Sequence, residues 1–201
     1  MSAALKLDLR MTPEEFAAFE EKSDVRHEYL NGDIIAMAGG TEVHSLISCN
    51  ASGELWSALK KRPCRVYESN MRIKIEATGS ETYPDCSVVC GTSKFEDLRR
   101  QTLLNPLLII EVLSESTEIY DRGKKFWNYR HIPSLQEYVL ITPTEALIEV
   151  FTRQPTDEWL MRVYEGLQAQ VRLDSLDLIL PIASFYAKTP VVGVPLEEVP
   201  G

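Results

Sequence analysis

The sequence predicts an α/β (α+β) fold, in which helices flank a mixed β-sheet and further antiparallel strands follow in the C-terminal part. Residues 107–113 (LLIIEVL) form a short apolar run without alternation, which is typical of a strand buried on both faces. A helical pattern with an apolar face follows directly over residues 117–131. After Pro133, three strand-like segments are separated by turn residues. Together they indicate a mixed sheet, a covering helix and a run of hairpins.

The bulk composition is that of a globular protein. The chain has 201 residues, 44% of them hydrophobic and 25% charged, which suits one domain over residues 1–188 and an irregular tail over residues 189–201. No apolar run approaches the roughly 20 residues of a membrane helix. The N-terminus lacks the apolar core of a signal peptide. We therefore expect a cytoplasmic protein without membrane association.

Cysteines and net charge limit the function further. The four cysteines (Cys49, Cys64, Cys86 and Cys90) form no CxxC pair and have apolar neighbours, so we expect buried, reduced thiols, in keeping with a cytoplasmic protein. A net charge of −9 argues against broad adhesion to polyanions. It leaves a nucleic-acid substrate open, because a local basic stripe can act within an acidic chain, and it suits a carboxylate site for divalent metal.

Local signals place the other elements in order. Thr12 fits an N-cap, and Glu15 completes a capping box, so a helix should run to about Lys22. The other expected elements are a turn at 31–32, strands at 34–38, 65–76 and 83–90, a helix at 42–61, a turn at 79–82, a charged connection at 91–102, strands at 137–141, 146–152, 158–165 and 176–180, and a helical turn at 181–186.

Three of these elements carry polar side chains of interest. His44 lies in the first turn of its helix, where the helix dipole disfavours the imidazolium, so a neutral ring is expected. Arg72 and Lys74 lie on the wet face of an alternating strand, either as phosphate contacts or simply as a solvated face. Asp85 stands at the start of the next apolar strand.

Glu111 is the carboxylate inside the central buried strand. An isolated ionised carboxylate there costs several kcal/mol or more, so it must be protonated, paired or bound to a cation. The following helix carries Lys124 and Lys125, with Ile119, Phe126 and Trp127 expected on its apolar face. Periodicity leaves both lysines at the edges of that face and does not choose between them.

The acids match a nuclease pattern in part. Pro84-Asp85, followed by Glu111 26 positions later, fits the PD-(D/E)xK motif, but the usual lysine position is Leu113. The surrounding segments RHEYLNGDIIAMAGG, YPDCSVV, IIEVLSESTEIYDRGKKFWNYR and LQEYVLI, spanning about 12–186, resemble the Uma family of restriction-endonuclease-like proteins, long catalogued as a domain of unknown function. One departure is Glu115, where family members usually carry Pro.

The resemblance implies a restriction-endonuclease-like core, Mg²⁺ (or Mn²⁺) as cofactor and DNA as substrate. The family lysine has moved onto the helix in a K-x-x-x-Y arrangement, which Lys125 and Tyr129 fit. Lys125 should then reach Glu111 or Asp85, while Lys124, about 100° away on the helix, points elsewhere. The resemblance also implies that Asp85, Glu111 and the Val112 carbonyl are metal ligands. Lys125 would activate the water and offset phosphate charge. Glu28 would be an auxiliary acid near the metal, and His44 a polar group at the rim of the site.

Each of these residues also has a purely structural interpretation. Asp85 also fits a turn cap, Glu111 a structural ion pair with a lysine, and Lys125, Glu28 and His44 ordinary surface or helix-start positions. Two functions therefore compete: a Mg²⁺-dependent endonuclease that hydrolyses DNA phosphodiesters, and a catalytically inactive nuclease-fold module for binding or assembly. The late antiparallel strands offer edges of the kind that pair in homodimers, so we also expect a homodimer.

Overall fold

The computed structural model describes residues 5–192, apart from residues 38, 97 and 116. Its strands form two six-stranded sheets and a two-stranded ribbon. In spatial order the first sheet contains β1 (Leu5–Arg10), β3 (Asp33–Ala36), β2 (His27–Leu30), β6 (Ser80–Thr82), β5 (Arg72–Ile75) and β8 (Thr102–Leu103). The second contains β12 (Trp159–Glu165), β11 (Leu147–Arg153), β10 (Glu137–Ile141), β9 (Leu108–Val112), β7 (Cys86–Cys90) and β4 (Cys64–Glu68), and the ribbon β13 (Gln170–Leu173) and β14 (Leu178–Pro181).

Both large sheets are mixed, because β9 pairs with β10 in parallel, as does β5 with β8, while the other pairs are antiparallel. The helices are α1 (Pro13–Glu20), α2 (Glu42–Leu59), α3 (Glu118–Tyr120), the π-helical turn η1 (Asp121–Lys125), α4 (Phe126–Tyr129) and α5 (Ile182–Phe185), with 3₁₀ turns η2 (Asp174–Leu176) and η3 (Pro190–Val192). The mixed sheet flanked by helices and the late antiparallel strands are thus confirmed.

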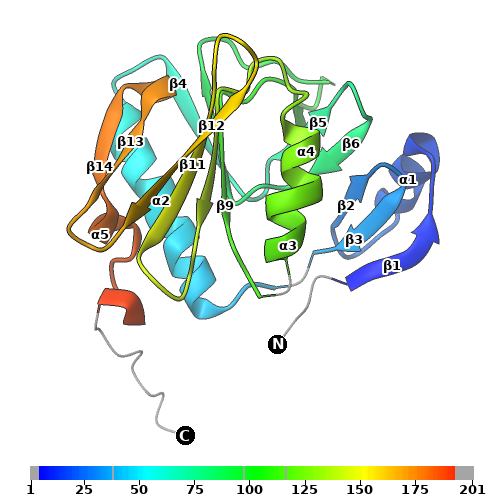
Figure 1. Ribbon diagram of the computed structural model, residues 1–201. Coiled ribbons are helices and arrows are strands. Elements are labelled where there is room, and N and C mark those ends of the chain that lie inside the picture. The colour runs from blue at the N-terminus through cyan, green and yellow to red at the C-terminus, as the bar shows by residue number, and fades with distance from the viewer. Residues whose placement is uncertain (1–4, 38, 97, 116, 193–201) are drawn as a thin grey trace, which may run out of the picture.

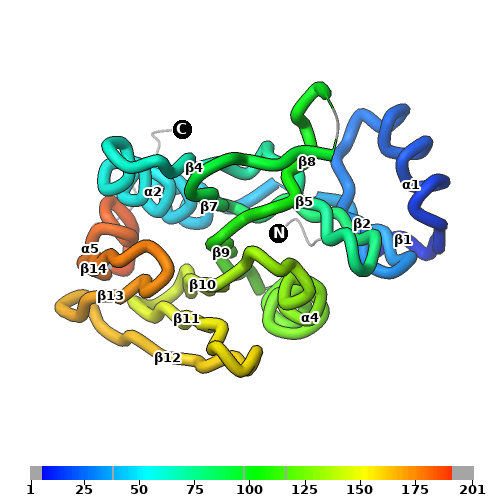
Figure 2. The backbone as a smooth tube through the Cα atoms, turned by 90° about the horizontal axis from the view of Figure 1, so that it is seen from above, coloured from blue at the N-terminus to red at the C-terminus, as the bar shows by residue number. Residues whose placement is uncertain are grey.

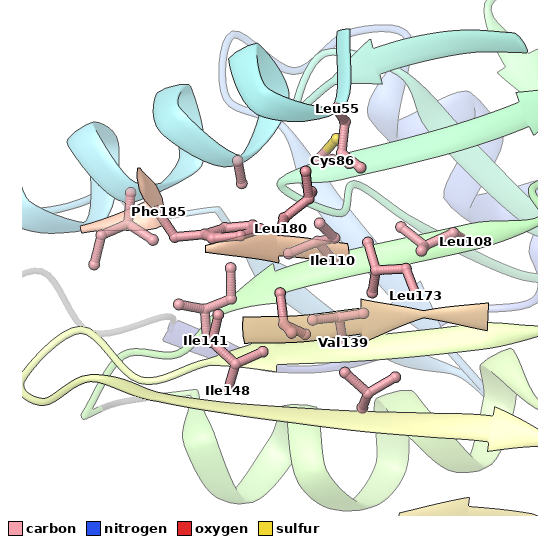
Figure 3. Packing of buried hydrophobic residues seen from close by; sticks show 14 of the residues in the cluster. Leu55, Cys86, Leu108, Ile110, Val139, Ile141, Ile148, Leu173, Leu180 and Phe185 are labelled. Carbon is pink, nitrogen blue, oxygen red and sulfur yellow. The ribbon is translucent and has the colours of Figure 1, made fainter. Parts of the chain in front are cut away.

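The second sheet lies between two covering layers (Figures 1 and 2). Helices α2 and α5 and the β13–β14 ribbon cover one face, and α3, η1 and α4 cover the other, on the side where the first sheet stands. On α2, Ile47, Ala51, Leu55 and Leu59 recur every four residues and are fully or almost fully buried. Each such Leu or Ile contributes about 1.5–3 kcal/mol on burial. Figure 3 shows this face of the core.

Some expected elements are confirmed and others are wrong. The first helix has the predicted capping box, with Thr12 and Glu15 bonded reciprocally. The expected strand at 65–76 is wrong, because a turn follows Glu68 and sends β4 and β5 into different sheets. Residues 80–82, expected as a turn, are strand β6, and β13 was not expected. Ile119 and Trp127 are 90% and 56% exposed, not part of an apolar face.

The cysteines also differ from expectation. Cys64 and Cys90 stand directly opposite each other on β4 and β7 and form a disulfide. The prediction of four reduced thiols is therefore wrong for this pair, and Cys49, though free, is exposed rather than buried. Cys86 is the buried free thiol, and burial raises its pKa to about 12, so it stays protonated.

The structure tests the expectations about membrane association and about the C-terminal tail only in part. Within the described residues, no helix is both long and apolar enough to cross a membrane. Of the tail expected at 189–201, residues 190–192 form η3, and Thr189 is buried. Residues 193–201 lie outside the described residues. One domain over residues 1–188 stays a prediction.

Strand β12 forms one open edge of the second sheet. In the register that joins it to β11, Gly166 N–H donates to Ala146 O and Gln154 N–H to Glu158 O. Because bonded and non-bonded pairs alternate in an antiparallel ladder, the even-numbered residues of β12 bond to β11. The odd-numbered residues therefore direct their N–H groups outwards. Unpaired outward groups of this kind are a template for another strand.

We propose that this edge pairs with the same edge of a second copy, because a strand aligned antiparallel to itself about Arg162 places Met161 opposite Val163. These side chains are 49% and 44% exposed, so pairing would bury apolar surface and satisfy outward N–H groups together. Arg162, which would face its own copy, is already paired with Asp174 at 2.8 Å.

Val163→Pro should convert a dimer to a monomer in sedimentation equilibrium, because proline removes an outward N–H without breaking the β11 ladder. Val163→Thr keeps the N–H and should remain dimeric. A monomeric wild-type protein at micromolar concentration, or a proline variant that dimerises as well as the wild type, would contradict this pairing.

Candidate active site

The site forms where β7 begins and β9 ends. These strands are antiparallel neighbours, with Cys86 opposite Ile110. Asp85 directly precedes β7, at the end of the pair where Glu111 lies on β9. The Val112 N–H donates to Asp85 Oδ2 at 2.8 Å. The pairing of β7 with β9 therefore brings the two acids named by the sequence motif to the same end of the sheet.

Glu111 points away from the α2 side of the sheet. Its strand neighbours Ile110 and Val112 pack in the core beneath α2, so by alternation Glu111 faces the opposite helical layer, and it is only 4% exposed. There Tyr129 Oη donates to Glu111 Oε1 at 2.8 Å, and Lys125 Nζ lies 2.8 Å from the same oxygen. Tyr129 thus holds the carboxylate directly, besides supporting its own helix.

A π-helical turn supplies the lysine. In η1 the Phe126 N–H donates to Asp121 O, five residues back, so this turn holds one more residue than an α-helical turn. Both Asp121 and Lys125 point inwards, at 3% and 5% exposure, with Nζ 3.6 Å from Asp121 Oδ1. Lys124 is mostly exposed and pairs with Asp33 at 3.1 Å. The lysine choice between positions 124 and 125 is thereby confirmed in geometry.

Glu28 arrives from β2 of the first sheet. Its Oε1 accepts the Tyr83 N–H at 2.9 Å and lies 3.0 Å from Lys125 Nζ. The ammonium of Lys125 therefore lies between carboxylates from both sheets, Glu28 and Glu111. Glu28, expected only through the family resemblance, is a buried residue of this cluster and not an ordinary surface acid.

The charges of the cluster follow from burial and crowding. Burial lowers the pKa of Lys125, but Glu111 and Glu28 raise it by more, so its pKa stands well above the ordinary value and the ammonium persists. Burial, with further carboxylates nearby, raises the pKa of Glu111 well above its ordinary range, although Lys125 opposes this. Burial also raises the pKa of Asp121. Several acids share one ammonium, so Glu111 and Asp121 keep their protons to higher pH than free carboxyl groups do.

His44 contacts the other end of the acid pair. Its Nε2 lies 3.4 Å from Asp85 Oδ2, while Ser48 Oγ donates to Asp85 Oδ1 at 3.2 Å. Burial lowers the pKa of His44, but the Asp85 carboxylate and the Val112 carbonyl raise it above its ordinary value overall. The pKa of His44 is thus shifted in the direction opposite to the one expected from the helix start, because a carboxylate in contact outweighs the helix dipole.

The backbone beside His44 is also constrained. A Cβ added to Gly40 would lie 2.9 Å from His44 Nδ1, closer than real Cβ contacts, so the glycine leaves space for the ring. Thr41 caps α2 by accepting the His44 N–H at 3.2 Å.

These groups line a cavity of about 470 Å³. Its polar lining includes Glu28, Asp85, Glu111, Asp121, Lys125, His44, Tyr83 and Tyr120, and its apolar lining Ile35, Ala36, Met37, Val43, Val112, Leu113 and Pro143. Asp121 and Tyr120 were missed from the sequence. The spacing of Asp121 four residues before Lys125 was the available signal, because such pairs share a helix face.

Arg72 and Lys74 are not among the lining residues of this cavity. Both pair with Glu81, at 3.0 and 3.6 Å, and Lys74 also pairs with Glu96. They line a separate cleft between α1 and the first sheet, of about 740 Å³. Their role as phosphate contacts stays a prediction.

The donor atoms near Asp85 and Glu111 are carboxylate and carbonyl oxygens, the type that Mg²⁺ and Mn²⁺ prefer. Among the residues that the structure describes, no group of three or more His, Cys, Asp or Glu side chains is already arranged around a metal position. A cation here would have to draw carboxylates from their present partners, Lys125 and His44.

Comparisons with known proteins identify the family of this chain. Residues 13–183 match the model of Uma2, described as "Putative restriction endonuclease". Two proteins of Synechocystis sp., "Uncharacterized protein slr1290" and "Uncharacterized protein sll1609", are 36% and 32% identical over 177 and 168 residues, which cover 88% and 84% of this chain and 92% and 95% of theirs.

A solved structure shares the fold. The crystal structure of a "putative nuclease belonging to DUF820" from Anabaena variabilis matches with a TM-score of 0.73 at 22% identity, over 88% of this chain and 98% of that one. At this identity the likeness supports the fold alone. The family match, in contrast, spans the strands, the helix and the cavity residues from Glu28 to Pro143. The chain therefore belongs to the Uma2 family.

Proposed function

We propose that the protein is a Mg²⁺-dependent endonuclease that hydrolyses DNA phosphodiesters. The observation that carries this proposal is the meeting of Asp85, Glu111 and Lys125 at one end of the second sheet, in a cavity open to a substrate. Membership of a family described as "Putative restriction endonuclease" supports the reaction class. The active state, the substrate and the metal are parts of the proposal.

The residues fit a divalent cation by charge. Five carboxylates line the cavity (Glu28, Asp85, Glu111, Glu115 and Asp121), against Lys125 and His44 as the lining groups able to carry positive charge. Excess buried negative charge is costly unless a cation offsets it. Asp85, Glu111 and the Val112 carbonyl would hold Mg²⁺ or Mn²⁺, which supplies Lewis-acid stabilisation of the phosphate.

Lys125 acts as a fixed positive charge in this proposal. Its raised pKa keeps the ammonium protonated, so it orients the attacking water and offsets phosphate charge rather than removing a proton. Glu28, in contact with Lys125, accepts the proton that leaves the water. The water oxygen bonds to phosphorus, the bond from phosphorus to the departing sugar oxygen breaks, and that oxygen takes a proton from solvent. His44 holds Asp85 in place at the rim.

An inactive binding or assembly module is the second candidate. It is favoured by the net charge of −9 and by a Lys125 already engaged with Glu28, Glu111 and Asp121. Both candidates keep the fold and differ in metal binding and turnover, so each of the next two experiments separates them.

Lys125→Ala should reduce cleavage of DNA in Mg²⁺ by about 10²–10³-fold, the range typical of removing one fixed electrostatic group at a reaction centre. Divalent-metal affinity should be retained or increased, because lysine is not a ligand and competes for the carboxylates. Lys124→Ala is the matched control and should keep wild-type cleavage, since its ammonium pairs with Asp33 away from the cluster. Thermal denaturation monitors folding, because removal of one partner from a buried ion pair costs about 3–5 kcal/mol. Equal loss in both variants would contradict the assignment.

Asp85→Ala and Glu111→Gln should each abolish a Mn²⁺ site in titration calorimetry, and with it DNA cleavage in Mg²⁺ or Mn²⁺. Glu111→Gln keeps the size of the side chain and removes the charge, so lost binding cannot be ascribed to a cavity. Asp33→Asn, which lies outside the cavity lining and pairs with Lys6 and Lys124, is the control that should bind metal as the wild type does. A wild-type protein that binds no divalent metal, and cleaves no plasmid, linear or branched DNA, would favour the inactive module.

A further inference from the structure

The cavity is acidic at one part and apolar elsewhere. Besides the carboxylates, its lining comes from the end of β3, the start of α2, the end of β9 and the β10–β11 turn, through Ile35, Met37, Val43, Leu113 and Pro143. A metal-binding cluster alone has no need of such a surface. Apolar lining beside a few convergent polar groups is typical of a pocket that encloses an organic ligand.

The size of the cavity restricts that ligand. At about 470 Å³ it lies within the ~300–1,000 Å³ of pockets that enclose one small molecule. It can receive one nucleotide unit, whereas a paired duplex segment would have to lie across its mouth.

The charges of the lining also restrict which ligand can bind. Proteins that hold duplex DNA track its phosphates with lysine and arginine. Among the residues that line this cavity, Lys125 is the one lysine or arginine, and it is 5% exposed and shared by three carboxylates. The lining therefore offers little affinity for the row of phosphates along a DNA strand. Apolar contact with a base has to supply the affinity instead.

We propose that the cavity receives a single unpaired nucleotide, with its base against Ile35, Met37 and Val43 and its phosphate at the carboxylate cluster. Tyr83 and Tyr120 also line the cavity, and aromatic rings of this kind stack on bases irrespective of sequence. The inference rests on the proposed nuclease function. It assigns the substrate class as single-stranded, frayed or flipped DNA rather than the interior of an intact duplex.

The first test compares one labelled sequence as a single strand, as a blunt duplex and within a covalently closed circle. Single-strand cleavage should exceed closed-circle cleavage by at least ~10-fold in kcat/KM, from the loss of base contacts in the paired form. Hydrolysis of methyl 4-nitrophenyl phosphate, compared between wild type and Asp85→Ala, reports on the proposed function independently, because this diester carries no base. Asp85-dependent hydrolysis together with equal or faster closed-circle cleavage would overturn the inference and leave the proposed function standing.

The second test fills the cavity. A Cβ added to Gly39, which lines the cavity, meets no atom within 4 Å, and neither does one added to Gly53 on the exposed side of α2. Gly39→Trp should therefore fold and weaken binding of the labelled single strand, measured by fluorescence anisotropy with Ca²⁺, by at least ~10-fold. Gly53→Trp should bind as the wild type does.

The binding measurement does not depend on turnover. If no variant hydrolyses any diester, the proposed function fails, but single-strand binding lost in Gly39→Trp and kept in Gly53→Trp would still support the nucleotide pocket. No preference for single strand over duplex in binding, or equal affinity of the two tryptophan variants, would overturn it.

Discussion

The burial of Lys125 is the constraint on which the arrangement of this molecule depends. An ammonium removed from water costs several kcal/mol unless carboxylates compensate it. Here the compensation comes from Glu28 on the first sheet and Glu111 on the second, with Asp121 one helical turn away. One side chain therefore joins two sheets and the helix that lies against them. None of the three elements can shift without leaving a buried charge unpaired.

The surrounding core makes that constraint rigid. On the same side of the second sheet, Tyr129 and Tyr138 are fully buried, with ring centroids 5.4 Å apart, and Phe126 stacks on Tyr138 at 5.3 Å. The Tyr138 hydroxyl also donates to Asp121 O at 3.1 Å, in the π turn. Aromatic packing thus fixes the backbone of the turn, while its two charged side chains face the cavity. Packing and electrostatics act on the same short helix from opposite sides.

Sequence reasoning succeeded where local rules and tertiary structure agree. The capping box at Thr12, the buried strand around Glu111 and the helix that follows are all decided within a few residues. The prediction of one long strand across Glu68 was wrong, because the alternation of apolar and polar residues continues through a turn. That turn becomes evident only from the pairing of β4 and β5 with different sheets. The disulfide between Cys64 and Cys90 was missed for the same reason, since the two residues lie opposite each other only in the register that pairs β4 with β7.

The site itself was predictable only in part. Asp85 and Glu111 follow from the motif and its spacing, and Lys125 follows from the family resemblance, but the placement of Glu28 depends on contact between sheets that no local pattern records. The direction of the pKa shift of His44 was missed because a carboxylate distant in sequence lies beside it. Ile119 was placed on the apolar face because helical periodicity was assumed to be uniform, whereas the π turn between Ile119 and Phe126 changes the rotation of the residues before it relative to those after it.

That wide turn has a consequence for comparing relatives of this chain. Because a π turn absorbs one extra residue, loss of one residue from 121–125 would restore an ordinary helical turn and leave the flanking segments, including the anchored Phe126 and Tyr129, where they are. The change would be confined to the turn that carries Asp121 and Lys125. In an alignment, a single-residue gap in this segment therefore marks a change in that turn, and not the neutral length variation that gaps in loops usually record.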